Sequence, residues 1–340
     1  MNQTIDPEVA AWVRRGLEVT RQLGIDPAAP TAVQRAATSE LADTLFGEYG
    51  EPGDPSVVKT CHHAPGQAGP IRIFAYRPAA RATVPALILL HGGGWAIGGI
   101  DEAVDDSLAR CRAARAGYAV FDVDYRLAPE HPFPAALEDA YSALRWVVAN
   151  AAELRIDPGR VAVNGSSAGG NLSAALALLA RDRGGPGLIG QVLEVPAVDL
   201  TDAGLWEVEC PDMSNGMGTT RGIRAAYLGG ILDAADNPYV SPLLSPDLSG
   251  LPPTHIMVAE VDPLRDQGLA YAARLRQAGV SVTASLHLGE LHGSASVIGR
   301  FRGARLWQEE VCAALRDFLR PAAAGGAAAG GAAAGVGEGR

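Results

Sequence analysis

The stretch that decides the fold runs, from Arg160 to Ala180, as RVAVNGSSAGGNLSAALALLA. Its beginning, residues 160–164, is typical of a buried strand, and its Ala- and Leu-rich end is typical of a helix. Between them stands the pattern G-x-S-x-G, whose small residues allow a turn sharp enough to expose the central side chain. The stretch therefore predicts a strand, a tight turn and a helix that present the hydroxyl of Ser167.

A second glycine-rich stretch also follows a strand-like run of apolar residues. Residues 85–90 are apolar throughout, and His91, three glycines and Trp95 come directly after them. Such a run is expected for a strand that is covered on both faces of its sheet. Because parallel strands bring their carboxyl ends to a common edge, main-chain N–H groups of this loop are expected near Ser167, where they can bind a developing oxyanion. The alternative is that the glycines form only a flexible turn.

Alternating strand and helix patterns continue along most of the chain. Eight strands are expected, over residues 57–62, 71–76, 86–90, 119–125, 161–164, 191–195, 255–261 and 282–288. Helical patterns separate most of the later strands, over residues 102–116, 134–152, 168–182 and 264–278. This alternation predicts an α/β protein with a largely parallel sheet and helices on both faces.

Both ends of the chain and one long interval depart from this pattern. Residues 1–50 have helical periodicity, and about 60 residues separate the sixth and seventh predicted strands, which is too many for a simple crossover. We expect an inserted helical element over about 203–240, forming a cap together with residues 1–50 on a catalytic domain of residues 51–321. A surface excursion without a role is the alternative. Residues 322–340 are a Gly/Ala tail that is expected to be disordered.

Composition excludes several classes of partner. The chain has 340 residues, 48% hydrophobic and 19% charged, with a formal net charge of −10 and scattered basic residues. We expect no nucleic-acid partner and no membrane partner. The N-terminus lacks the regions of a signal peptide, and no apolar run reaches the roughly 18 residues of a membrane span, so a soluble cytoplasmic protein is expected. The four cysteines lack zinc-ligand spacing, which predicts free thiols and no metal site.

A serine nucleophile needs a base, because its hydroxyl is a poor nucleophile at neutral pH. The chain order that accompanies G-x-S-x-G is serine, acid, histidine, with the histidine in a loop after the last strand. His292 occupies such a loop and is the expected base, with His287 as the alternative. Because the base must be neutral to act, activity should fall as the pH drops through its pKa, near 6.5 if unperturbed.

The expected acid is Asp262, which ends the strand before the last one. A helix is predicted to begin at Pro263, so Asp262 can also serve as a helix cap, and the two roles need not compete. Glu260 is predicted to lie within the strand. Asp266 is expected to pair with Arg265 or with solvent.

Four ordered motifs together resemble the bacterial hormone-sensitive-lipase-like esterases of the α/β-hydrolase superfamily. They are HGGGW at 91–95, DYRLAPEHPFPAA at 124–136, GSSAGG at 165–170 and DPLRD at 262–266. The resemblance implies the α/β-hydrolase fold, with a mostly parallel eight-stranded sheet, flanking helices and a helical cap. It also implies that the second motif is structural, with a buried Arg126 and Glu130 holding the loop behind the site.

The function implied by the resemblance is that of a carboxylesterase of the EC 3.1.1 class, which works through an acyl-enzyme intermediate without metal or organic cofactor. The implied triad consists of Ser167, Asp262 and His292. The implied oxyanion hole consists of the backbone N–H groups of Gly92, Gly93 and Ala168. The expected partner is a small-molecule ester of short to medium acyl chain, since nothing suggests anchoring at a lipid interface. Dimers are common in the family, so a homodimer is one expected assembly.

Three positions depart from the family pattern. Ser166 stands where the family usually has Asp before the nucleophile, and Gln267 stands where a Glu is usual. Ser294 replaces the aromatic residue that usually follows the glycine after the catalytic histidine. None of these changes removes a catalytic group, but they bear on the substrate. An amidase, deacylase or acyltransferase with the same triad is one alternative function, and a non-catalytic ligand-binding relative is another.

Overall fold

The structure is a computed structural model that describes residues 5–26, 29, 31–79, 82–202, 220–296 and 299–320. The predictions for residues 203–219 and for the tail at 322–340 fall outside these residues. None of the helices in the described ranges combines the length and the apolarity that a membrane span requires.

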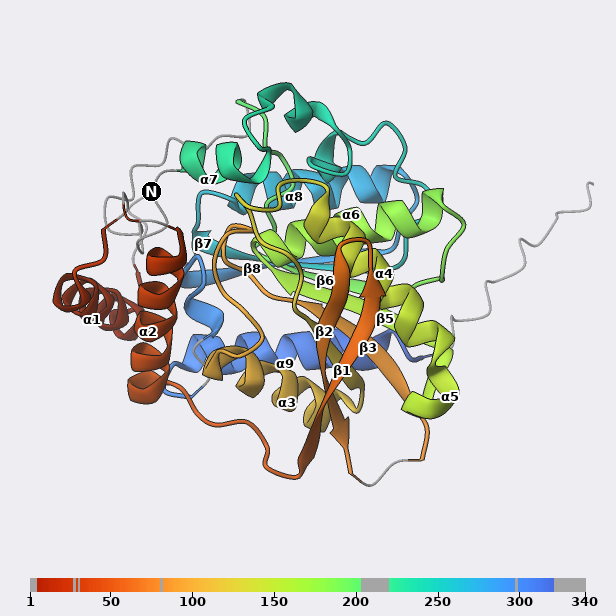
Figure 1. The fold of residues 1–340 in the computed structure, drawn as a ribbon, viewed down its shortest axis with the longest axis horizontal. Helices are drawn as coiled ribbons and strands as arrows, with labels where there is room; N and C mark the ends of the chain where they lie inside the picture. The colour runs from red at the N-terminus through yellow and green to blue at the C-terminus, as the bar shows by residue number, and fades with distance from the viewer. Residues whose placement is uncertain are drawn as a thin grey trace, which may run out of the picture.

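A twisted sheet of eight strands runs through the centre of the molecule (Figure 1). The strands are β1 (Val57–Gly66), β2 (Gly69–Pro78), β3 (Val84–Leu90), β4 (Ala119–Val123), β5 (Ile156–Ser166), β6 (Gly190–Glu194), β7 (Thr254–Val261) and β8 (Val282–Leu291). Their order in the sheet is β1-β2-β4-β3-β5-β6-β7-β8. Only the β1–β2 and β2–β4 pairs are antiparallel, which confirms the predicted eight-stranded, mostly parallel sheet of the α/β-hydrolase fold.

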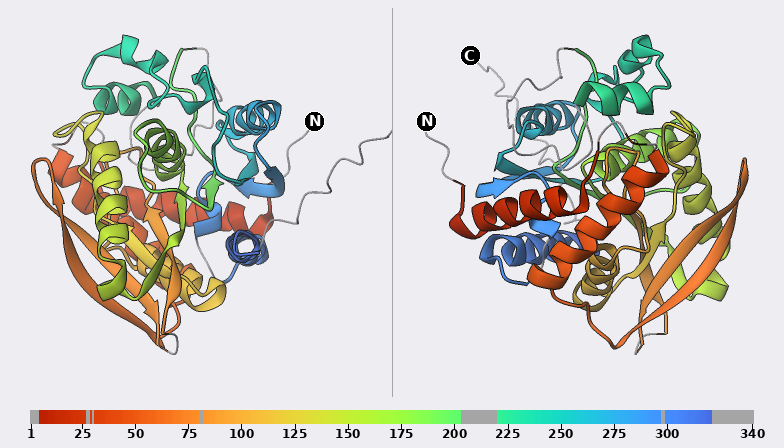
Figure 2. Two further views of the ribbon diagram at one scale, coloured as in Figure 1. Left: turned by 90° about the vertical axis from the view of Figure 1, so that its right-hand side faces the viewer. Right: turned by 60° about the vertical axis from the view of Figure 1, so that its left-hand side comes forward.

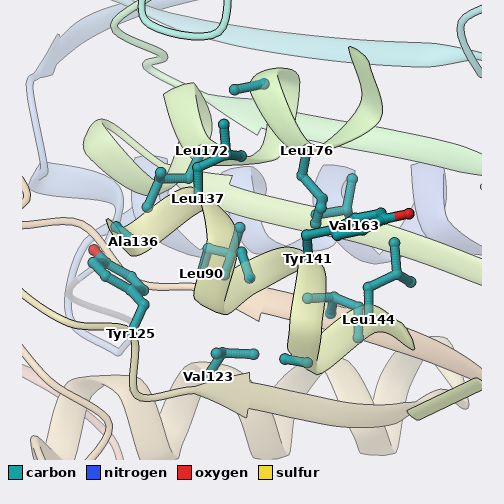
Figure 3. Close-up of a cluster of buried hydrophobic side chains, with 14 of the residues drawn as sticks. Leu90, Val123, Tyr125, Ala136, Leu137, Tyr141, Leu144, Val163, Leu172 and Leu176 are labelled. Carbon is teal, nitrogen blue, oxygen red and sulfur yellow. The ribbon is translucent and has the colours of Figure 1, made fainter. Parts of the chain in front are cut away.

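Helices cover both faces of this sheet, and apolar residues of the strands alternate between the two layers. The helices are α3 (Ala103–Ala116), α4 (Ala135–Ala149), α5 (Ala151–Leu154), α6 (Ala168–Asp182), α8 (Arg265–Gln277) and α9 (Arg302–Asp317). Leu87 and Leu89 of β3 pack with residues of α3 and α9, whereas Ile88 and Leu90 pack with residues of α4 and α6. Figure 3 shows Leu90 among the side chains of the layer that contains α4 and α6. The period of two is what a strand buried on both faces requires.

Two helix boundaries differ from the sequence predictions. The helix after β7 begins at Arg265 and not at Pro263. The helix predicted over 134–152 is divided at Asn150 into α4 and the single turn α5. Helix α9 was not among the helical patterns named from the sequence, although it places Trp307 and Val311 in the core.

The N-terminal residues form two helices, α1 (Pro7–Leu23) and α2 (Thr31–Tyr49), which lie side by side on the outside of the domain (Figure 2). They share a small core of Val19, Leu41 and Leu45. Val9 of α1 packs against Val261 and Leu291, the last residues of β7 and β8. The pair therefore lies beside the carboxyl edge of the sheet.

The long interval before β7 contains short helical elements where the structure describes it. They are α7 (Thr220–Tyr227) and two 3₁₀ turns, Leu232–Asp236 and Pro242–Leu244. The ring of Tyr227 stacks on Trp95, with centroids 4.2 Å apart. This part of the interval thus packs against the glycine-rich loop, and its assignment as a cap stays a prediction.

Candidate active site

The turn between β5 and α6 holds Ser167 in an unusual backbone conformation. Its φ is 56° and its ψ is −114°, a region that residues other than glycine rarely adopt. The turn is tight because the flanking glycines touch backbone: a Cβ at Gly165 would lie 2.3 Å from the carbonyl oxygen of Gly169. A Cβ at Gly169 would lie 2.0 Å from the carbonyl oxygen of Leu90. The small residues of G-x-S-x-G are therefore required by the packing of this turn.

Strand register brings the glycine-rich loop to the same place. Leu90, the last residue of β3, pairs with Gly165 of β5, so the residues after Leu90 run alongside the serine turn. A Cβ at Gly92 would lie 3.2 Å from the Ser166 carbonyl oxygen and 3.8 Å from the Ser167 Cβ. Gly93 has a φ of 110°, and a Cβ there would lie 2.1 Å from the carbonyl oxygen of Ile97. Gly92 thus lies directly beside the serine turn, and Gly93 has to be glycine for the turn toward Ile97.

An irregularity in the β7–β8 pairing brings Asp262 and His292 together. Ala259 pairs with His287, but two residues later Val261 pairs with Leu291, so β8 gains two extra residues in this stretch. Asp262 and His292 are the next residues of the two strands and become neighbours. Without the irregularity, Val261 would face Gly289, and the histidine would lie beyond reach.

Three side chains that end separate strands form a continuous hydrogen-bonded chain. His292 Nε2 lies 2.9 Å from Ser167 Oγ, and His292 Nδ1 lies 3.0 Å from Asp262 Oδ2. The side chain of Asp262 is fully buried, and its other oxygen accepts a 2.7 Å hydrogen bond from the Leu264 N–H. The carboxylate therefore both holds the histidine and organises the turn before α8, as the sequence suggested.

The electrostatic surroundings of His292 favour its protonated form. Burial opposes the charge, but the carboxylate of Asp262 and its hydrogen bond outweigh burial and raise the pKa of His292 above its usual range. His91 differs, because burial lowers its pKa. Its Nδ1 lies 2.7 Å from the carbonyl oxygen of Gly92, to which it donates as a neutral imidazole.

A buried polar network supports the serine turn from beneath. The Ser167 N–H donates to the carbonyl oxygen of Glu194 at 2.8 Å. The Glu194 carboxylate accepts hydrogen bonds from Arg112, Trp307 and Asn164, at 2.7, 2.7 and 2.9 Å. The hydrogen bonds to Glu194 offset the desolvation of its carboxylate, whereas Nε of Arg112 finds no hydrogen-bond partner among the described residues.

A cavity of about 270 Å³ opens onto Ser167. It lies between α2, the glycine-rich loop and the start of α3, and its lining includes Leu41, Leu45, Gly93, Glu102, Asp105 and His292. Burial raises the pKa of Glu102 to about 8 and also raises that of Asp105. Trp12 also lines this cavity, whereas Tyr227 is buried against Trp95.

The remaining predicted residues lie away from the serine or differ from expectation. The alternative base, His287, and His255 instead share the carboxylate of Glu310, at 3.1 and 2.7 Å. Asp266 pairs with Arg265 at 2.8 Å, as predicted. The implied burial of Glu130 is wrong, because its side chain is exposed and its carboxylate pairs with Arg35 of α2.

Two of the positions that depart from the family pattern have structural roles. Ser294 is fully buried, where it accepts a 3.0 Å hydrogen bond from the Leu291 N–H and contacts the carboxylate of Glu290. It thereby closes the turn that follows His292. Gln267 accepts hydrogen bonds from the N–H groups of Val198 and Asp199.

Within the described part of the chain, no three His, Cys, Asp or Glu side chains are grouped so that they could hold a metal ion. Cys61, Cys111 and Cys312 are free thiols, and Cys210 lies outside the described residues.

Comparisons with known proteins agree on one family. A family model described as alpha/beta hydrolase fold matches residues 87–296. Carboxylesterase NlhH of Mycobacterium tuberculosis is 46% identical over 230 residues, which cover 66% of this chain and 70% of that protein. Carboxylic ester hydrolase LipN of the same organism is 43% identical over 270 residues, covering 75% and 69%. The solved structure of a hyperthermophilic esterase from the archaeon Pyrobaculum calidifontis has a TM-score of 0.83 and 34% identity, covering 92% of this chain and 98% of its own.

Proposed function

This chain belongs to the hormone-sensitive-lipase-like family of α/β hydrolases and is a carboxylesterase, and from that premise we propose that Ser167, His292 and Asp262 are its nucleophile, base and acid. The observation that carries this assignment is the position of His292. One of its ring nitrogens lies 2.9 Å from the serine hydroxyl and the other lies 3.0 Å from the buried carboxylate. This geometry allows the imidazole to remove the hydroxyl proton while the carboxylate stabilises the resulting charge.

In the proposed reaction, Ser167 Oγ attacks the carbonyl carbon of the ester as its proton passes to His292 Nε2. The same proton then leaves with the alcohol, and an acyl-enzyme remains. A water molecule attacks the acyl group, again losing its proton to His292, and release of the carboxylic acid restores the serine.

The proposed oxyanion hole consists of the backbone N–H groups of Gly92, Gly93 and Ala168. The contact distances around Gly92 support it, because that backbone lies directly beside the nucleophile. Ala168 is the first residue of α6, where N–H groups lack partners within the helix. Loss of one such donor typically lowers turnover by about 10²- to 10³-fold.

The cavity supports the proposal that the acyl group is short or of medium length. Its volume of about 270 Å³ lies near the lower end of the range for small-molecule sites. The same proposal includes a cap over the cavity, formed by residues 1–50 and about 203–240. The position of α2 in the cavity lining supports it. A cytoplasmic location and a homodimer stay predictions.

The test is hydrolysis of p-nitrophenyl esters of increasing acyl length by the wild type and by Ser167→Ala. We expect activity on acetate and butyrate, and a loss of turnover of roughly 10⁶-fold in the variant, as in other serine triads. An organophosphate should label Ser167 in the wild type and in Ser166→Ala, but should not label Ser167→Ala. Equal turnover by wild type and Ser167→Ala would overturn the assignment.

A further inference from the structure

One arginine of the N-terminal helices reaches across to the loops of the catalytic domain. Arg35, on α2, donates from Nε to the carbonyl oxygen of Ala96 at 2.7 Å and from Nη2 to that of Ala128 at 2.8 Å. Its guanidinium also grips the carboxylate of Glu130, with Nη1 at 3.1 Å from one oxygen and Nη2 at 2.7 Å from the other. The hydrogen bond from Arg35 lowers the pKa of Glu130.

The two carbonyl groups that Arg35 contacts belong to residues that are hydrogen-bonded to the glycine-rich loop. The N–H groups of Ala96 and Ile97 both donate to the carbonyl oxygen of Gly93, at 3.1 and 3.0 Å, and close a tight turn. The Ala128 N–H donates to the carbonyl oxygen of Trp95 at 2.8 Å. Arg35 therefore contacts Ala96 and Ala128 on two segments that are already bonded to each other.

Arginine is suited to this position for a physical reason. Its planar guanidinium presents several donors in a fixed arrangement, so one side chain can bind two carbonyl groups and a carboxylate together. Lysine presents a single ammonium group and cannot reproduce that arrangement. Its hydrogen bonds are also charge-assisted, and such bonds are stronger than those between neutral groups.

We propose that Arg35 is a positioning residue, which holds the turn at Gly93–Ala96 so that the N–H groups of Gly92 and Gly93 point at the reacting carbonyl. The N-terminal segment then contributes to turnover and does more than cover the cavity. This inference rests on the proposed function, because it needs those N–H groups to bind the oxyanion. It predicts an effect on the transition state that exceeds the effect on substrate binding.

The chain offers a matched control on the same two helices. Arg15 of α1 pairs with Glu48 of α2 in the same two-pronged manner, with Nη2 2.7 Å from the carboxylate. The side chains of Arg15 and Arg35 are 28% and 27% exposed, respectively. The Arg15–Glu48 pair joins α1 to α2 within the N-terminal segment, whereas only Arg35 contacts the carbonyl groups of the two loops of the catalytic domain.

The experiment compares Arg35→Ala, Arg35→Lys, Glu130→Gln and Arg15→Ala with the wild type, using p-nitrophenyl butyrate. The active sites are titrated with an organophosphate, so that kcat refers to folded enzyme. We expect kcat to fall by about 10- to 100-fold in Arg35→Ala with KM changed by less than about 3-fold, since small misplacements of catalytic groups cost this much. The kcat of Arg35→Lys should lie between the values for Arg35→Ala and the wild type. Glu130→Gln and Arg15→Ala should keep kcat within about 3-fold of the wild type.

A second measurement reports the oxyanion hole directly. A trifluoromethyl ketone forms a tetrahedral oxyanion on the serine, so its inhibition constant should rise in Arg35→Ala in proportion to the loss in kcat/KM. If Arg35→Ala does not fold, Arg35→Lys carries the same comparison. A change in KM alone, or equal losses in Arg35→Ala and Arg15→Ala, would overturn the inference. The proposed function fails separately, if Ser167→Ala keeps its activity.

Discussion

Individual residues decide the chemistry here through their immediate neighbours, and His292 is the clearest case. From sequence alone, its pKa was expected near 6.5 if unperturbed. In the structure it is partly buried beside a fully buried carboxylate, and the charge of that carboxylate outweighs the effect of burial. The pKa of His292 is therefore raised, which makes the imidazole a stronger base but leaves less of it neutral at low pH.

This shift leads to a pH dependence that can be measured. In the proposed mechanism the neutral form of His292 is the active one, so activity should fall as the pH drops through its pKa, and a raised pKa moves that fall to higher pH. We expect the acidic limb of kcat/KM, measured with p-nitrophenyl butyrate, to have an apparent pKa above 6.5. A limb at or below 6.5 would show that Asp262 does not act on the base in this way.

Ser294 shows how a departure from the family pattern can be understood from its contacts. Sequence comparison by motif marks it only as an unusual residue after the catalytic histidine. In the structure it is fully buried, and it bonds to the backbone of Leu291 and to Glu290. Ser294 therefore shapes the loop that carries His292. It is not among the residues that line the cavity next to Ser167.

Among the elements of the fold, the pair of strands β7 and β8 determines whether the proposed triad can form. The two extra residues of β8 between His287 and Leu291 move the end of that strand into line with Asp262. Gly289 lies in this stretch with a φ of 76°, and its N–H donates to Glu260 at 2.8 Å. Its carbonyl oxygen accepts a hydrogen bond from the Asp6 N–H at 3.0 Å, next to the start of α1.

Gly289→Ala tests the importance of this irregular stretch. A Cβ there would lie 3.2 Å from the Asp6 nitrogen, and the left-handed backbone costs a residue other than glycine roughly 1–2 kcal/mol. We expect lower stability in urea unfolding and a loss in kcat of at least about 10-fold, because the base is misplaced.

Gly279→Ala is the matched control for that substitution. Gly279 also has a left-handed φ, 82°, but a Cβ there would meet no atom within 4 Å. It lies before the start of β8, at the end opposite His292. Similar stability losses in both variants, with kcat reduced only in Gly289→Ala, are expected; an unchanged kcat in both would contradict the role given to the irregular stretch.

For the molecule as a whole, short-range and long-range features differ in how well the sequence predicts them. The eight strands could be predicted because apolar runs and the glycines that bound them are visible in short stretches of sequence. Ser167, Asp262 and His292 could be selected because each follows a predicted strand, and parallel strands end at one edge. The contacts of Arg35 could not be predicted, since they join residues 61, 93 and 95 positions apart and no local pattern marks them. The same holds for the network around Glu194, which joins four elements.

The packing of the N-terminal helices on the catalytic domain should also be visible in the stability of the protein. Glu102 precedes α3 and lines the cavity beneath α2, where burial, followed by the nearby Asp105 and Asp43, raises its pKa to about 8. A carboxyl whose pKa is raised on folding favours the folded state while it is neutral, and this contribution is lost as the pH rises toward about 8. We therefore expect Glu102→Gln, which stays neutral, to gain stability over the wild type as the pH is raised from 5 to 9.

Urea unfolding at several pH values measures this difference. The control is Glu40→Gln, which changes an exposed carboxyl of α2. A stability difference that does not change with pH would show that the carboxyl of Glu102 is not held neutral beneath α2.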